Sequence, residues 1–149
     1  MKTVLFIDDR TSVIEPLKEA LEDDGFAALT AITAQEGQET LRKCIEEGKP
    51  VTLVVLDVGF PAMSIQEMLR HENGAVAVRN APAADLWQGA TLYPQLRKEF
   101  PELKIIIYSV RGEEEVRTLF PNTDFDCTFL RKGKDDPLEI YRTIKQHLK

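Results

Sequence analysis

The chain has 149 residues, of which 43% are hydrophobic and 30% are charged, and its formal net charge at pH 7 is −6. This length suits a single domain, residues 1–149, and no apolar run approaches the ~20 residues that a membrane-spanning helix needs. The acidic balance argues against DNA binding through the general surface. The spacing of Cys44 and Cys127 resembles no zinc site, so we expect two free thiols.

Short β-branched and aliphatic runs recur along the chain and predict buried parallel strands. Segments with helical periodicity separate these runs. The predicted strands are TVLFI at 3–7, FAALTA at 26–31, VTLVVL at 51–56, LKIIIYS at 103–109 and CTFL at 127–130.

The first two helices have predictable starts and ends. Ser12 and Glu15 have the spacing of a capping box, and Thr33 and Glu36 repeat it before a helix over 34–47. Gly25 marks the end of the first helix. The apolar stripe predicted for that helix consists of Val13, Leu17, Ala20 and Leu21.

Three later segments complete the helices. We expect helices over 85–99, 113–119 and 137–148, the last with Asp136 as its cap and Pro137 at its first position. Five strands that alternate with five helices predict a doubly wound α/β sheet with helices on both faces. In the flavodoxin-like strand order 2-1-3-4-5, the first and third strands are neighbours and sites form at the carboxyl ends of the strands.

Three carboxylates gather at that edge of the predicted sheet. Asp57 ends the third strand, where it can be partly solvated, and Asp8 and Asp9 end the first. Close carboxylates repel one another unless a cation lies among them, and an all-oxygen cluster suits Mg²⁺. The alternative is that Asp8 and Asp9 only cap the loop into the first helix.

Two further polar residues follow later strands. Ser109 ends the fourth strand, and Lys132 follows the fifth. A hydroxyl and an ammonium that face an aspartate are groups that hold phosphoryl oxygens. Each is ordinary by itself, because strand ends are commonly polar, but together with the aspartates they form a pattern.

This pattern, in this order and over nearly the whole chain, resembles the response-regulator receiver domains of two-component signalling. The resemblance implies that Asp57 accepts a phosphoryl group and that Ser109 and Lys132 contact its oxygens. The matching residues are FIDD (Asp8, Asp9), LDVGFP (Asp57, Pro61), YS (Ser109) and FLRK (Phe129, Lys132).

The resemblance also implies a metal site and a switch. Mg²⁺ would be bound by Asp8, Asp9, Asp57 and the backbone carbonyl of Gly59, and Phe129 would change its exposure with the state of Ser109. For Phe129, a role in core packing alone is the alternative.

The chain departs from the family pattern at three places. Gly133 stands where members usually have proline after the lysine, and Val110 is bulkier than the usual residue after the serine. The family's glycine after the third strand has its best candidate in Gly89, far downstream, so 62–87 is read as an insertion. We expect it to fold over the edge as a lid that brings Arg70, His71 or Arg79 near the acidic site, and a plain surface loop is the alternative.

The implied function is a phosphoacceptor switch that regulates a protein partner. The upstream partner would be a histidine kinase or a phosphotransfer protein, and the activity would be limited to self-catalysed phosphoryl transfer and autodephosphorylation. We expect no direct DNA binding, no membrane, no output domain after the last helix, and a cytoplasmic location, since MKTVLFIDD offers no signal peptide.

Three alternatives remain open. A pseudo-receiver would keep the fold and bind a partner without phosphorylation. An aspartyl-phosphate phosphatase would resemble D-x-D-x-T, but DDRT at 8–11 has Arg10 in place of the second aspartate. A flavin or dinucleotide protein would need a Gly-rich turn after the first strand, and none is present.

Overall fold

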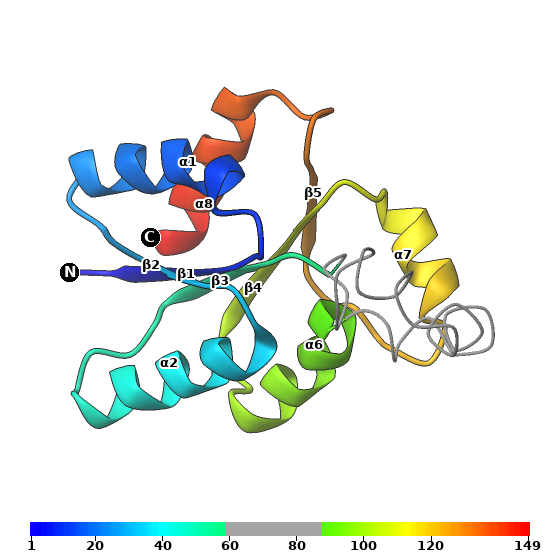
Figure 1. Cartoon of the computed structure of the whole chain (residues 1–149), viewed down its shortest axis with the longest axis horizontal. Helices are drawn as coiled ribbons and strands as arrows, with labels where there is room; N and C mark the ends of the chain where they lie inside the picture. The colour runs from blue at the N-terminus through cyan, green and yellow to red at the C-terminus, as the bar shows by residue number, and fades with distance from the viewer. Residues whose placement is uncertain (59–87) are drawn as a thin grey trace, which may run out of the picture.

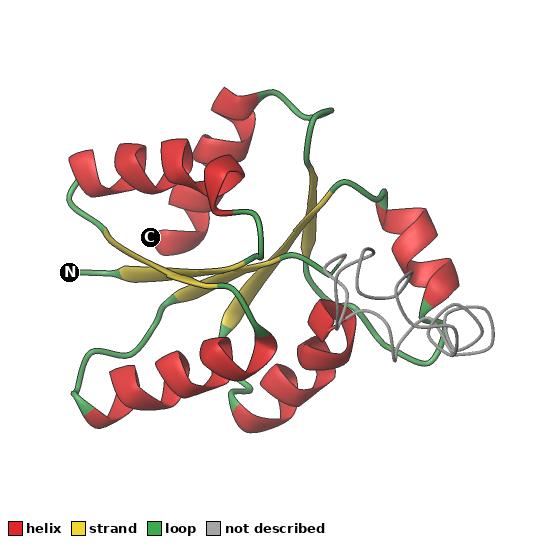
Figure 2. Cartoon of the chain, viewed as in Figure 1, coloured by secondary structure: helices red, strands yellow, loops and turns green. Residues whose placement is uncertain are grey.

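The computed structural model describes residues 1–58 and 88–149. Its centre is a five-stranded sheet, which is yellow in Figure 2. The strand order is β2-β1-β3-β4-β5, and all four pairings are parallel. This confirms the predicted fold class and strand order. The strands are β1 (Thr3–Ile7), β2 (Ala27–Ala31), β3 (Leu53–Leu56), β4 (Lys104–Ser109) and β5 (Thr128–Arg131).

Helices cover both faces of the sheet (Figure 1). On one face lie α1 (Thr11–Asp23) and α8 (Pro137–Leu148), and on the other lie α2 (Ala34–Glu46), α6 (Gln88–Glu99) and α7 (Glu113–Leu119). Within the described ranges, no helix is long and apolar enough to span a bilayer.

The hydrophobic core is divided into two layers by the sheet. Alternate residues of β1 show the division, because Val4 and Phe6 pack with α1 and α8, whereas Leu5 and Ile7 pack with α2 and α6. All four are at most 1% exposed. Strands buried on both faces explain why the sequence shows continuous apolar runs instead of alternation.

Two helix starts form as predicted. The Thr33 hydroxyl accepts a hydrogen bond from the backbone N–H of Glu36 at 3.1 Å, which caps α2. The Asp136 carboxylate accepts from the N–H of Leu138 at 2.8 Å, with Pro137 in the first turn of α8. Both caps depend on residues close in sequence.

The predicted capping box of the first helix is wrong. The helix begins at Thr11, and the residue before it, Arg10, makes no side-chain cap bond. The Asp8 carboxylate instead accepts from the N–H of Arg10 at 2.9 Å and shapes the turn into α1. Leu17 and Leu21 of the predicted stripe are buried, but Val13 is 37% exposed and Ile14 is buried in its place.

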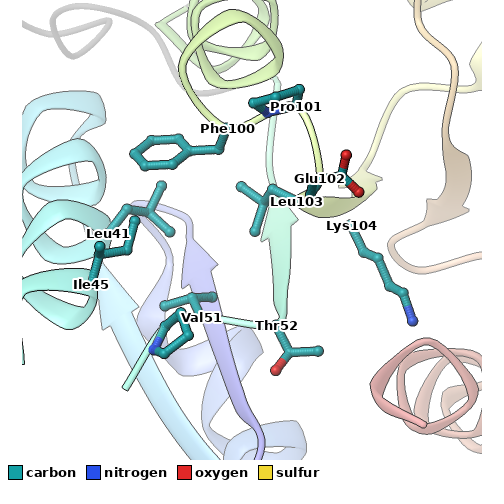
Figure 3. A pocket seen from close by; sticks show the side chains of 10 residues that line it. Leu41, Ile45, Val51, Thr52, Phe100, Pro101, Glu102, Leu103 and Lys104 are labelled. Atoms are coloured by element: carbon teal, nitrogen blue, oxygen red, sulfur yellow. The ribbon is translucent and has the colours of Figure 1, made fainter. Parts of the chain in front are cut away.

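An apolar hollow of about 400 Å³ lies at the amino edge of the sheet, opposite the edge where the predicted site residues gather (Figure 3). Leu41 and Ile45 of α2 face it from one side, and Phe100 and Leu103 from the turn that enters β4. Lys104, at the rim, turns away and donates to the backbone carbonyl of His147 at 3.0 Å. The walls of the hollow are therefore formed mainly by the exposed ends of the hydrophobic core.

Candidate functional site

The three predicted carboxylates meet at the carboxyl edge of the sheet. Parallel pairing of Ile7 with Leu56 brings the next residues, Asp8 and Asp57, side by side. One carboxylate oxygen each from Asp8, Asp9 and Asp57 lies within 4.8 Å of the others. The structure thus brings together the aspartates that the sequence placed on two strands.

Lys132 enters this group from the end of β5. Its ammonium lies 3.2 Å from Asp57 Oδ2 and also donates to Asp8 Oδ2. The backbone N–H of Lys132 donates to the carbonyl of Ser109 at 2.8 Å, which fixes where the side chain starts. The lysine therefore binds both buried carboxylates at once.

The expectation that Asp57 is partly solvated is wrong. Asp57 is 6% exposed and Asp8 3%, so bulk water does little to stabilise their charge, and the Lys132 ammonium offsets part of it. An unpaired buried charge costs several kcal/mol, which is why the ammonium is needed here. The sequence led us to expect that Lys132 contacts phosphoryl oxygens. Its ion pairs with Asp8 and Asp57 were not predicted, although the predicted sheet places this ammonium at the same edge as three carboxylates.

The site carries more negative than positive charge. Burial raises the pKa of Asp8 above its ordinary value, and the neighbouring charge of Asp57 adds to the rise, while the hydrogen bond from Lys132 opposes it. Asp9, by contrast, is exposed at the rim. Three carboxylates beside one ammonium leave an excess that a cation can balance.

This set of donors fits Mg²⁺. The ion prefers carboxylate oxygens and keeps several waters, so it needs few protein ligands with space at the surface. Asp8, Asp9 and Asp57 offer oxygens close enough to share one ion. The fourth predicted ligand, the carbonyl of Gly59, lies outside the described residues.

Ser109 lies at the end of β4, fully buried beside this group of charges. Its hydroxyl oxygen accepts a hydrogen bond from the N–H of Arg111 at 3.2 Å. A hydroxyl that accepts one bond can still donate another. The next residue, Val110, is 53% exposed, and its carbonyl accepts from Nε of Arg131 at 3.2 Å.

Phe129, the predicted switch residue, lies apart from the carboxylates. It belongs to β5, where it is half-buried against the core between the sheet and α7. Its ring meets that of Phe125 edge-on at 5.8 Å between centroids, and the Arg117 guanidinium lies 5.2 Å from its centroid. The ring is thus held by α7 and the loop before β5.

Two of the departures from the family pattern have a structural counterpart. Gly133 adopts φ of +72°, a left-handed conformation that proline cannot take, so this loop differs from one with proline there. Gly89, at the start of α6, packs directly against the backbone of Asp57. Pro61 and the predicted lid with Arg70, His71 and Arg79 lie beyond the described part of the chain.

Comparisons with known proteins agree on the architecture. A receiver domain protein of Methanospirillum hungatei matches with a TM-score of 0.67 and 22% identity over 99% of this chain and 94% of that one. The response regulator TrrA of Thermotoga maritima, solved with Mg²⁺ and beryllofluoride, matches with 0.63 and 21% over 99% and 100%. A chain in the complex of histidine kinase ThkA with TrrA matches with a TM-score of 0.64 and 21% identity, over 100% of this chain and 100% of the matched chain.

Sequence comparison finds less. The transcriptional regulatory protein AruR of Pseudomonas aeruginosa is 36% identical over 58 residues, which are 39% of this chain and 24% of that protein. The chain therefore corresponds to about a quarter of that relative, and no family model matches it. Strand order, helix placement and the solved structures together confirm the resemblance: the chain has the fold of response-regulator receiver domains.

Proposed function

We propose that this chain is a phosphoacceptor switch of a two-component phosphorelay and that Asp57 accepts the phosphoryl group. The observation that carries the proposal is the meeting of Lys132 with Asp8 and Asp57 at the carboxyl edge of a receiver fold. A carboxylate beside an ammonium, a hydroxyl and further carboxylates can act as a nucleophile toward phosphorus.

The proposed step is an in-line transfer. An oxygen of Asp57 forms a bond to phosphorus while the bond between phosphorus and the donor's nitrogen or oxygen breaks, and the electron pair leaves with the donor. Lys132, already 3.2 Å from Asp57 Oδ2, balances charge on the transferred oxygens, and the Ser109 hydroxyl donates to one of them. Water later cleaves the acyl phosphate and restores the carboxylate.

Asp8, Asp9 and Asp57 would hold Mg²⁺ in this scheme. When bound, the ion neutralises charge that develops on the phosphoryl oxygens. Asp8 would contribute one oxygen to the ion while its Oδ2 accepts from the Lys132 ammonium and its Oδ1 from the Arg10 N–H. The reaction is self-catalysed, so the protein is an enzyme only in this narrow sense.

Partners follow from the same proposal. A histidine kinase or phosphotransfer protein would supply the phosphoryl group, as the solved kinase complex of TrrA suggests for a chain of this fold. Phosphorylation would shift the domain between two conformations, with Phe129 and α7 as the responding part, and a protein partner would read the change. We place this exchange in the cytoplasm, without direct DNA or membrane contact.

The decisive experiment is phosphorylation by acetyl phosphate with Mg²⁺, followed by intact-mass spectrometry. The wild type should gain the mass of one phosphoryl group, and Asp57→Asn should gain none. Asp124→Asn, which changes an exposed carboxylate before β5, is the matched control and should behave as wild type.

Two outcomes would contradict the proposal. A wild type that gains no mass, under conditions that phosphorylate a known receiver domain, would favour the pseudo-receiver alternative. Undiminished mass gain in Asp57→Asn would place the acceptor elsewhere.

A further inference from the structure

Gly89 lies unusually close to the backbone of the proposed acceptor. A Cβ atom built on Gly89 would lie 1.9 Å from the carbonyl oxygen of Asp57 and 2.6 Å from Cα of Val58. Both atoms belong to the main chain, so a side chain at this position could not be accommodated by a rotamer change. The first turn of α6 therefore rests on the peptide that joins Asp57 to Val58.

The same stretch of backbone is also held by the neighbouring strand. The N–H of Asp57 donates to the carbonyl of Ile7 in β1 at 3.0 Å, and Val58 is fully buried. Asp57 is thus fixed between β1 and α6. Its carboxylate has little freedom to move without one of these two neighbours moving first.

The α6 helix is fastened at its far end. The Arg97 guanidinium donates to the carbonyls of Leu103 and Asp126 and, through Nε, to the hydroxyl of Tyr93 at 3.1 Å. Leu92 and Tyr93 are each 1% exposed. A helix held in this way cannot slide outward at low cost, so added bulk at Gly89 would displace the Asp57 peptide instead.

We propose that Gly89 is a positioning residue for Asp57: the absence of a side chain at Gly89, in the first turn of α6, sets where the acceptor carboxylate lies relative to Lys132 and Asp8. The inference rests on the proposed function for its kinetic consequence, but its geometric consequence is independent. An error of about 1 Å in the placement of a reacting group can cost a reaction on the order of 100-fold.

The test compares two glycine substitutions. Gly89→Ala adds a methyl group that meets backbone, whereas Gly37→Ala, inside α2, adds one that meets the flexible end of Ile7 at 2.6 Å. Neither glycine has a positive φ, so alanine suits both backbones and only space distinguishes the sites. For each variant we would measure the melting temperature, its rise on adding Mg²⁺, and the rate of phosphorylation by acetyl phosphate.

Gly89→Ala should slow phosphorylation on the order of 10-fold to 100-fold and reduce the rise in melting temperature caused by Mg²⁺. Gly37→Ala should keep the wild-type phosphorylation rate and the wild-type rise in melting temperature with Mg²⁺, even if its own melting temperature falls as far as that of Gly89→Ala. A folded Gly89→Ala protein with the wild-type rate and Mg²⁺ response would overturn the inference.

A measurement on the wild type covers the case in which Gly89→Ala does not fold. Addition of Mg²⁺ and beryllofluoride should shift the backbone amide NMR signals of Gly89 and Ala90 together with that of Asp57, and leave that of Gly37 in place. A shift at Asp57 without one at Gly89 would overturn the inference. Failure of the wild type to take up phosphate would refute the proposed function instead, while the Mg²⁺ response would still test Gly89.

Discussion

The two edges of the sheet are built from the same strands and differ in what they bury. Of the five buried polar or charged residues in the described part of the chain, four lie at the carboxyl edge: Asp8, Asp57, Ser109 and Lys132. The amino edge carries an apolar hollow lined by ends of the core (Figure 3). The comparison indicates that burial of apolar side chains at the amino edge stabilises the fold. At the carboxyl edge, by contrast, holding buried charges close together lowers the free energy of unfolding.

The largest expected effect comes from removing the ammonium. Lys132→Met leaves Asp8 and Asp57 buried without their partner, and breaking such a pair costs about 4 kcal/mol of unfolding free energy. Urea denaturation without Mg²⁺ would measure it. Lys134→Met, a neighbouring exposed lysine, is the control and should change little. Equal free energies of unfolding of the two variants would mean that leaving Asp8 and Asp57 without Lys132 does not destabilise the carboxyl edge.

The amino edge should respond through packing alone. Leu41→Ala removes a side chain that is 2% exposed and should cost roughly 3 kcal/mol of unfolding free energy. Phosphorylation of Asp57 by acetyl phosphate should keep the wild-type rate, because the change lies at the other edge. Ile45→Ala, at the same hollow but 50% exposed, should cost much less. A slower phosphoryl transfer in Leu41→Ala would show that the edges are coupled.

Relief of repulsion should give a smaller effect of opposite sign. Asp57→Asn removes one of the crowded carboxylates while Lys132 keeps Asp8 as its partner, so unfolding without Mg²⁺ should require about 1 kcal/mol more. The difference from wild type should narrow as Mg²⁺ is added, because the ion stabilises the wild type more. If Asp57→Asn is less stable than the wild type at every Mg²⁺ concentration, repulsion among the carboxylates does not destabilise the fold.

The smallest expected effect concerns thiol reactivity and leaves stability unchanged. Burial raises the pKa of Cys127 to about 11, so at pH 8 only about one molecule in a thousand carries the thiolate. A disulfide reagent should label Cys44, whose thiol is less buried, well before Cys127. The rate at Cys127 should rise about tenfold per pH unit below pH 11. Equal labelling rates of Cys44 and Cys127 at pH 8 would show that water reaches the Cys127 thiol.

Local signals carried most of the fold. The bounds of α8 and its cap at Asp136 depend on residues within one turn of each other, and the apolar runs marked every strand. The start of α1 was missed because the Asp8 side chain shapes that turn while also bonding to Lys132. A residue that serves two neighbours cannot be assigned from spacing alone.

The site was predictable in its membership and not in its contacts. The strand order placed Asp8 beside Asp57, as the structure confirms. Asp57 is paired with Lys132, which lies 75 residues away, and its backbone is approached closely by Gly89 of α6. Such distant packing leaves no periodic trace in the sequence.

The contact of Lys132 with Asp8 joins residues 124 positions apart, which has a consequence for how the chain folds. Closing so long a loop is entropically unfavourable and slow, so β1, β2 and β3 are expected to pair before β5 docks. Until then the acidic residues that follow β1 and β3 remain hydrated. During synthesis the nascent chain would carry Asp8 and Asp57 long before Lys132 emerges, and the charged edge would assemble only as the last strand closes the sheet.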